Sequence, residues 1–306
     1  MQLDIQRQTV LAKILLAPIG VAALLYWISQ KRPIPTSADA TLLTMGALIA
    51  LLSIVPFALR LREVLKVIDF DISSITTTRI LTQSMFYYFF IPLSVGTEVS
   101  KFAKLKNLDK NRSSSSIASA IVLDHIVGLT VLVGMSICLY LLIKPITVRI
   151  DSTTTALILV GGIAAFGALF VFLKSKPNID FNEIRKKLSS RKTNLLLATV
   201  YSSIMHTLIA AAVTVGAGHW QIDISYLEIL FVLTGAFLFQ MVPINFIGVG
   251  AIEVAGAGLY LALGLSVSES LTLVSLLYCY RILIAFIGGV WEFVDACKEH
   301  SYARRG

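Results

Sequence analysis

Six apolar runs in this chain are too long for the core of a water-soluble domain. They lie at about residues 10–29, 41–59, 117–143, 156–173, 195–217 and 270–294. A helix needs roughly 20 apolar residues to cross a hydrocarbon core of about 30 Å. Only 14% of the 306 residues are charged, whereas 56% are hydrophobic. The sequence therefore predicts an all-α integral membrane protein, with about six full transmembrane helices in a single polytopic domain over residues 1–306.

Two further apolar regions, at residues 79–107 and 226–264, are interrupted. The first contains "IPLSVGTEVSK" and the second "VPINFIGVGAIE", so each carries proline, glycine and glutamate in that order. Proline ends a helix, and glycine permits a tight turn. Broken backbone at membrane depth is tolerated only where it is buried in protein or lines a water-filled cavity. We therefore expect each region to form a re-entrant helical hairpin that enters and leaves on one side.

The distribution of the 26 Lys and Arg residues predicts the orientation. Most of them share one face if the N-terminus is cytoplasmic, and these include Arg60, Arg62 and Lys66 in a loop after the second run. Because cytoplasmic loops are enriched in basic residues, we predict a multi-pass protein of the cell (inner) membrane with both termini in the cytoplasm. The first apolar run is long enough to stay as an anchor. This pattern explains the net charge of +8, so nucleic-acid binding is not expected.

The two interrupted regions begin segments of similar order, at about residues 79–143 and 226–294. Each has an apolar helix, proline, glycine, glutamate, a short helix, a serine-rich start and a long helix with charge inside it. The predicted topology makes the two hairpins enter from opposite faces. They are therefore candidates for an inverted-topology repeat, an arrangement that places substrate sites near the membrane midplane. The alternative is chance similarity between apolar segments.

Arg281 lies near the middle of the last apolar run. An arginine at that depth costs roughly 2.5–3.5 kcal/mol on insertion scales, so it should face the protein interior. One interpretation is a structural ion pair with Glu253 or Asp124. The other is recognition of a substrate phosphate, because a guanidinium can bind phosphate oxygens through two parallel hydrogen bonds.

Glu98 and Glu253 follow glycine at the start of the returning half-helices. A carboxylate there is favoured by the helix dipole and can cap free N–H groups, which is one interpretation of both residues. The other is functional, because the same helix N-termini could receive a lipid phosphate once the glutamates are paired or protonated. Lys101 lies three residues after Glu98 and could neutralise it.

Asp124 and His125 fall inside the run at 117–143. A histidine can change charge near neutral pH, so Asp124, His125, Glu98 and Glu253 are candidates for proton coupling. A structural hydrogen bond is the alternative for His125, and it is the preferred interpretation for His206. The four histidines are scattered and the acidic residues do not cluster, so neither a metal site nor another cofactor is predicted.

The two motifs resemble the membrane domain of lysylphosphatidylglycerol synthases and their stand-alone flippase-like relatives. The resemblance covers about residues 40–295. It rests on Gly96, Glu98 and Lys101 in the first motif, and on Pro243, Gly248, Gly250, Glu253 and Arg281 in the second. The chain departs from the family pattern at Thr97, between glycine and glutamate, and at Lys101, where the family has arginine. It also has Asp124-His125 where an acid-arginine pair is common.

The resemblance implies movement of lipids or lipid-linked saccharides between leaflets. We therefore expect a flippase whose partner is an anionic phospholipid or a polyprenyl-phosphate-linked lipid. The expected substrate-binding residues are Arg281, Lys101, Glu98, Glu253, Asn245, Gly96, Gly248 and Gly250. Because the chain ends at Gly306, the soluble aminoacyl-transferase domain of the synthases, and with it lysyl transfer, is not expected.

Two other functions are compatible with the sequence. The protein could be a membrane-embedded transferase, or an accessory protein in lipid-linked glycan assembly that forms homo-oligomers or binds the assembly enzymes. A transferase would need a nucleophile-base pair or a metal cluster at the membrane face. The sequence offers no convincing one, so we expect that the protein is not an enzyme.

Overall fold

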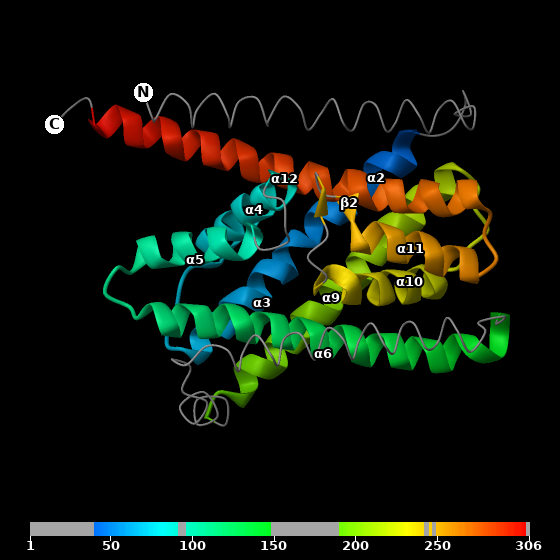
Figure 1. Cartoon of the computed structure of the whole chain (residues 1–306), viewed down its shortest axis with the longest axis horizontal. Coiled ribbons are helices and arrows are strands. Elements are labelled where there is room, and N and C mark those ends of the chain that lie inside the picture. Colours follow the sequence, from blue (N-terminus) through cyan, green and yellow to red (C-terminus); the bar gives the residue numbers. More distant parts are fainter. Residues whose placement is uncertain (1–39, 91–95, 148–189, 242–244, 247–248, 304–306) are drawn as a thin grey trace.

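The computed structural model describes residues 40–90, 96–147, 190–241, 245–246 and 249–303, which are mainly helical (Figure 1). The helices are α2 (Ala40–Leu52), α3 (Ile54–Val67), α4 (Ser74–Phe90), α5 (Gly96–Leu108), α6 (Ser114–Thr147), α9 (Lys192–His219), α10 (Tyr226–Leu238), α11 (Ala251–Ala262) and α12 (Val267–Ala303). A short 3₁₀ turn, Phe239–Met241, follows α10. The predicted runs at 10–29 and 156–173 lie outside the described residues.

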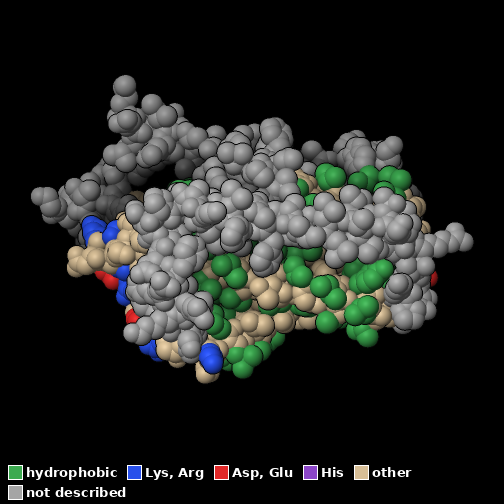
Figure 2. All heavy atoms as spheres, turned by 60° about the horizontal axis from the view of Figure 1, so that its bottom comes forward, with side chains coloured by type: hydrophobic (Ala, Val, Ile, Leu, Met, Phe, Trp, Pro, Cys, Tyr) green, Lys and Arg blue, Asp and Glu red, His purple; other side chains and the backbone are tan. Residues whose placement is uncertain are grey.

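Four of the described helical segments are long and apolar enough to cross a membrane. They are Ala40–Val67, Ser114–Ile143, Lys192–His219 and Val267–Cys297, and they coincide with the other four predicted runs. Large apolar side chains face outward from them, such as Leu48 at 60% exposed and Leu196 at 64%. Figure 2 shows hydrophobic side chains over the middle of one face, with Lys and Arg gathered toward one end. A mainly helical, multi-pass membrane fold is therefore confirmed.

The two interrupted regions form two helical pairs. Helices α4 and α5 make the first pair, and α10 and α11 make the second. The pairs lie toward opposite ends of the molecule, α5 on the left and α11 on the right of Figure 1. In the second pair, the turn contains two antiparallel strands, β1 (Asn245–Phe246) and β2 (Val249–Gly250). Asn245 therefore lies in this turn opposite Gly250, whereas Gly248 and Pro243 lie outside the described residues.

Each pair packs against the long helix of the other half of the chain. Helix α4 packs most extensively against α12, and α10 packs against α6. The α10 contact is apolar, with the rings of Tyr140 and Phe231 centred 6.4 Å apart. The α4 contact adds polar bonds, because Gln83 and Tyr87 donate to Asp295 and Glu292 over 2.7 and 2.8 Å. The long helices thus tie the two halves together.

Gly288 lets the backbones of α4 and α12 approach closely, because a Cβ atom there would overlap the carbonyl oxygen of Thr82. Gly288→Ala is expected to lower the free energy of unfolding by about 1–3 kcal/mol through overpacking. Gly258→Ala is the control, because its Cβ would enter open space. The control should be stabilising by about 0.5–1 kcal/mol, since glycine is unfavourable in a helix. Thermal unfolding in detergent distinguishes them, and equal shifts would contradict a close α4–α12 contact.

Candidate functional site

Arg60 and Asp124 form a buried ion pair between α3 and α6. Arg60 Nε donates to Asp124 Oδ1 at 2.8 Å, and Nη2 donates to Oδ2 at 2.9 Å. A third bond, from Arg60 Nη1 to Ser202 Oγ, reaches α9 over 3.4 Å. The Asp124 side chain has no exposed surface, and that of Arg60 is 8% exposed. The two parallel bonds make this the strong, bidentate form of a charged hydrogen bond.

The prediction that Arg60, Arg62 and Lys66 lie in a loop is wrong, because all three belong to α3. Helix α3 continues to Val67, and Arg60 points into the protein. The apolar run ends near residue 59, so the basic residues after it were expected in a loop. In the structure Pro56 lies in the first turn of α3, where a missing N–H costs little. The spacing of Arg60 and Glu63, three residues apart, was a signal that both could share a buried helix face.

Lys101 extends this group toward α5. Its Nζ atom lies 3.0 Å from Glu98 Oε2 and 3.8 Å from Asp124 Oδ2, and its side chain is only 2% exposed. His125 Nε2 approaches the same Glu98 oxygen at 3.0 Å. The neighbours Asp124 and His125 therefore have different partners. We call Arg60, Asp124, Lys101, Glu98 and His125 the first cluster.

Arg281 and Glu253 form a second cluster with Tyr88 and Gly250. Arg281 Nη1 donates to Glu253 Oε1, and both side chains are buried. The other glutamate oxygen, Oε2, accepts a 2.7 Å hydrogen bond from the Gly250 backbone N–H at the start of α11. The Arg281 guanidinium lies over the Tyr88 ring of α4, 4.8 Å from its centre. Glu253 therefore caps a helix and neutralises a buried cation with one side chain.

The structure thus groups most of the predicted site residues, but in two places. Lys101, Glu98, Asp124 and His125 belong to the first cluster, and Arg281 and Glu253 to the second. Of the partners predicted for Arg281, Glu253 is confirmed, and Asp124 pairs instead with Arg60. Gly96 begins α5, and Gly250 precedes α11.

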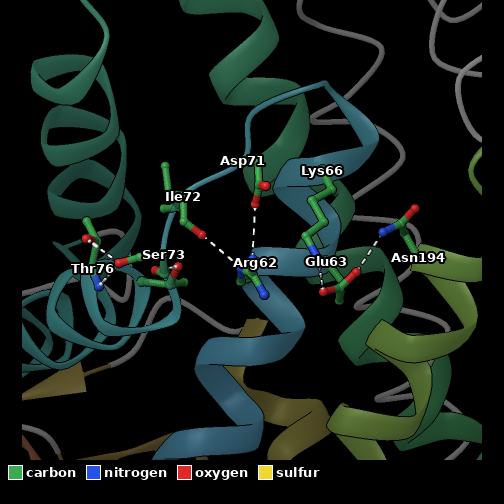
Figure 3. Close-up of polar contacts among 9 residues, drawn as sticks. Arg62, Glu63, Lys66, Asp71, Ile72, Ser73, Thr76 and Asn194 are labelled. Carbon is green, nitrogen blue, oxygen red and sulfur yellow. Dashed lines mark hydrogen bonds and ion pairs between the residues drawn. The ribbon is translucent and has the colours of Figure 1, made fainter.

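A third polar network, not foreseen from the sequence, lies where α3 meets the start of α9 (Figure 3). Glu63, only 4% exposed, accepts from Lys66 Nζ and Asn194 Nδ2, each at 2.6 Å. Nearby, Arg62 Nε donates to the Ile72 carbonyl at 2.8 Å. The Arg62 bond anchors the segment between α3 and α4, and the Asn194 bond joins α3 to α9. Within the described ranges, His, Cys, Asp and Glu do not form a group of three that could hold a metal ion.

A comparison with protein families identifies the chain over most of its length. The family model described as the lysylphosphatidylglycerol synthase TM region matches residues 10–289. No curated protein and no solved structure matches the chain. The family match covers both helical pairs and all members of both clusters.

Proposed function

The chain belongs to the family of the lysylphosphatidylglycerol synthase TM region, and from this premise we propose that it moves an anionic lipid between the leaflets of the bilayer. Membership in this family supports a lipid-related function in the membrane. The proposed substrate of transport is an anionic phospholipid or a polyprenyl-phosphate-linked lipid. In this proposal the protein acts as a transporter and not as an enzyme.

One observation supports transport above the others. Two short helices, α5 and α11, start near the middle of the molecule and run toward opposite ends (Figure 1). Each has a glutamate in its first turn that is paired with a buried cation. Discontinuous helices that meet at the midplane are the usual site of substrate binding in transporters with inverted repeats. Buried charge at membrane depth is costly and is commonly functional. We therefore propose that the two pairs are re-entrant hairpins of such a repeat.

The chemistry follows from the charges of the two clusters. Lys101 and Arg281 would attract a phosphate to membrane depth, and the N-termini of α5 and α11 would add partial positive charge. Glu98 and Glu253 neutralise the cations when no lipid is bound. The acyl chains would stay beside the apolar faces of the long helices, which carry exposed side chains such as Leu141 and Phe286.

The orientation is part of the same proposal. The end of the molecule that holds the α5–α6 loop carries Lys106, Lys110 and Arg112, and Lys and Arg gather toward that end in Figure 2. Basic residues are enriched on the cytoplasmic side of membrane proteins. We therefore assign this end, and both termini, to the cytoplasm of a cell with an inner membrane.

Reconstitution tests the transport proposal. Purified protein in liposomes should make fluorescent phosphatidylglycerol in the inner leaflet accessible to an impermeant quencher added outside, faster than in protein-free liposomes. The double variant Glu98→Gln/Lys101→Gln removes one charge of each sign and should reduce this rate by roughly tenfold or more, as expected for loss of a binding group. Lys106→Gln, in the same helix but outside the first cluster, is the matched control.

Two results would contradict the proposal. One is folded wild-type protein that moves neither phosphatidylglycerol nor a polyprenyl phosphate faster than empty liposomes do. The other is equal rates for the double variant and the wild type, because the first cluster would then have no part in transport. Turnover of a sugar donor by the same preparation would favour the transferase instead.

A further inference from the structure

The two glutamates at the hairpin turns differ in their exposure and in their partners among the described residues. Glu253 uses both oxygens, one for Arg281 and one for the backbone N–H of Gly250, and its side chain is 6% exposed. Glu98 presents one oxygen, Oε2, to both Lys101 and His125, and its side chain is 27% exposed. The Glu253 carboxylate is therefore shared between a cation and its own helix, whereas among the described residues the Glu98 Oε2 atom is shared by Lys101 and His125.

The positive charge of Lys101 is neutralised mainly by the carboxylate of Glu98. The other nearby carboxylate, Asp124, already makes two short bonds to Arg60, and it lies 3.8 Å from Lys101 Nζ. Glu98 is closer, at 3.0 Å. If the Glu98 carboxylate moved away, the buried ammonium group of Lys101 would keep only the Asp124 carboxylate, at 3.8 Å, of these two neighbours. Such a group requires another anion at the same place, since an unpaired buried charge is strongly unfavourable.

We propose that Glu98 occupies an anion site formed by Lys101, His125 and the first turn of α5, and that the phosphate of the transported lipid displaces it. This inference rests on the proposed function and identifies where the headgroup binds. Lys101 Nζ and His125 Nε2 converge on one oxygen position, which a phosphate oxygen can take over. The N–H groups at the start of α5 favour an anion there.

The exchange also selects the class of headgroup. The first cluster holds the cations Arg60 and Lys101 and the carboxylates Asp124 and Glu98, so two lysine or arginine charges face two carboxylate charges. A phosphodiester carries a single negative charge, as a carboxylate does, and the exchange conserves the charge of the cluster. A phosphomonoester brings nearly two negative charges, which the cluster would have to hold at low dielectric. The site therefore takes a phosphodiester headgroup in preference to a monoester.

Removing the competing carboxylate tests the proposal. Glu98→Gln should bind short-chain phosphatidylglycerol about tenfold more tightly than the wild type in detergent solution, a change of the size expected when one charged competitor is lost. Dissociation constants from isothermal titration calorimetry give the comparison. The double variant Glu98→Gln/Lys101→Gln should lose the gain. Glu228→Gln is the control, because Glu228 also lies in the first turn of a helix. Its side chain accepts a hydrogen bond from the backbone N–H of Ser225, which a glutamine side chain can also accept.

Further titrations distinguish the source and class of the anion. Short-chain phosphatidic acid is the phosphomonoester, diacylglycerol has no phosphate, and inorganic phosphate and glycerophosphoglycerol have no acyl chains. Tighter binding by Glu98→Gln should be largest for phosphatidylglycerol and absent for diacylglycerol. If inorganic phosphate gains equally, the site takes free anions and the lipid assignment fails.

The proposal is overturned if Glu98→Gln binds phosphatidylglycerol no more tightly than the wild type, or if Glu228→Gln produces the same gain. Glu98→Asp, which keeps the charge on a shorter side chain, should show a smaller gain and serves if the glutamine variant does not fold. A protein that transports lipid without this gain retains the proposed function and loses the anion site. If Glu98→Gln binds more tightly but the protein does not transport lipid, the anion site is kept and the proposed function is lost.

Discussion

Arg60→Met is expected to lower the free energy of unfolding by about 3–5 kcal/mol, because it leaves the Asp124 carboxylate buried without its bidentate partner. Asp124 has no exposed surface, so water cannot replace the lost bonds. Unfolding of the detergent-solubilised protein, followed by circular dichroism, gives the measurement.

Two further variants show whether burial is the cause. Arg60→Met/Asp124→Leu removes both charges and should recover most of the lost stability, since apolar side chains of similar size often replace a buried pair at little cost. Asp71→Ala breaks only the exposed contact with Arg62, because the Asp71 side chain is 69% exposed and Arg62 keeps its bond to the Ile72 carbonyl (Figure 3). It should cost less than about 1 kcal/mol. A double variant as unstable as the single one would show that the pair is not the origin of the effect.

Under the proposed transport function, joining α4 to α12 is expected to slow lipid movement by roughly tenfold or more, because transporters with inverted repeats alternate by moving one repeat against the other. Gln83 and Asp295 lie in contact across these helices, with Gln83 Nε2 2.7 Å from Asp295 Oδ2. Cysteines at both positions, in a background without the three native cysteines, can be joined by a bifunctional thiol reagent that contains a disulfide. Reduction should restore the rate.

The control joins two positions that belong to neither hairpin. Arg191 Nη2 and Asp69 Oδ1 lie 2.6 Å apart on exposed side chains that link α9 to the end of α3. A cross-link there should leave the transport rate within about twofold, since it fixes helices outside the moving parts. Equal inhibition by both cross-links would mean that overall rigidity limits transport. No inhibition by either would mean that α4 and α12 do not move apart during transport.

The sequence predicted the parts of the fold that depend on composition and on chain breaks. Long apolar runs identify spans because few polar groups are tolerated in lipid, and four of them coincide with described helices. The proline, glycine and glutamate in each interrupted region mark the ends of α4 and α10 and the starts of α5 and α11. The partner of Arg281 was also predictable, because the cost of its burial requires a nearby acid such as Glu253.

The sequence did not predict which charges meet between helices. Arg60 and Glu63 follow an apolar run, where basic and acidic residues normally mark a loop, and only the packing of α3 against α6 and α9 makes them buried. Asp124 and His125 were treated as one unit, although neighbours on a helix point about 100° apart. Their separate partners, Arg60 and Glu98, follow from that geometry.

The crossed packing of the hairpins makes the two halves of the chain interdependent. Helix α4 lies on α12, and α10 lies on α6. A cut anywhere between α6 and α9 would therefore turn the contacts of α4 with α12 and of α10 with α6 into contacts between two separate chains, whereas those of α5 with α6 and of α11 with α12 would stay within one chain. Helices α4 and α10 are thus each covered by a long helix from the other half of the chain. The packing within this single chain resembles an exchange of helices between two subunits.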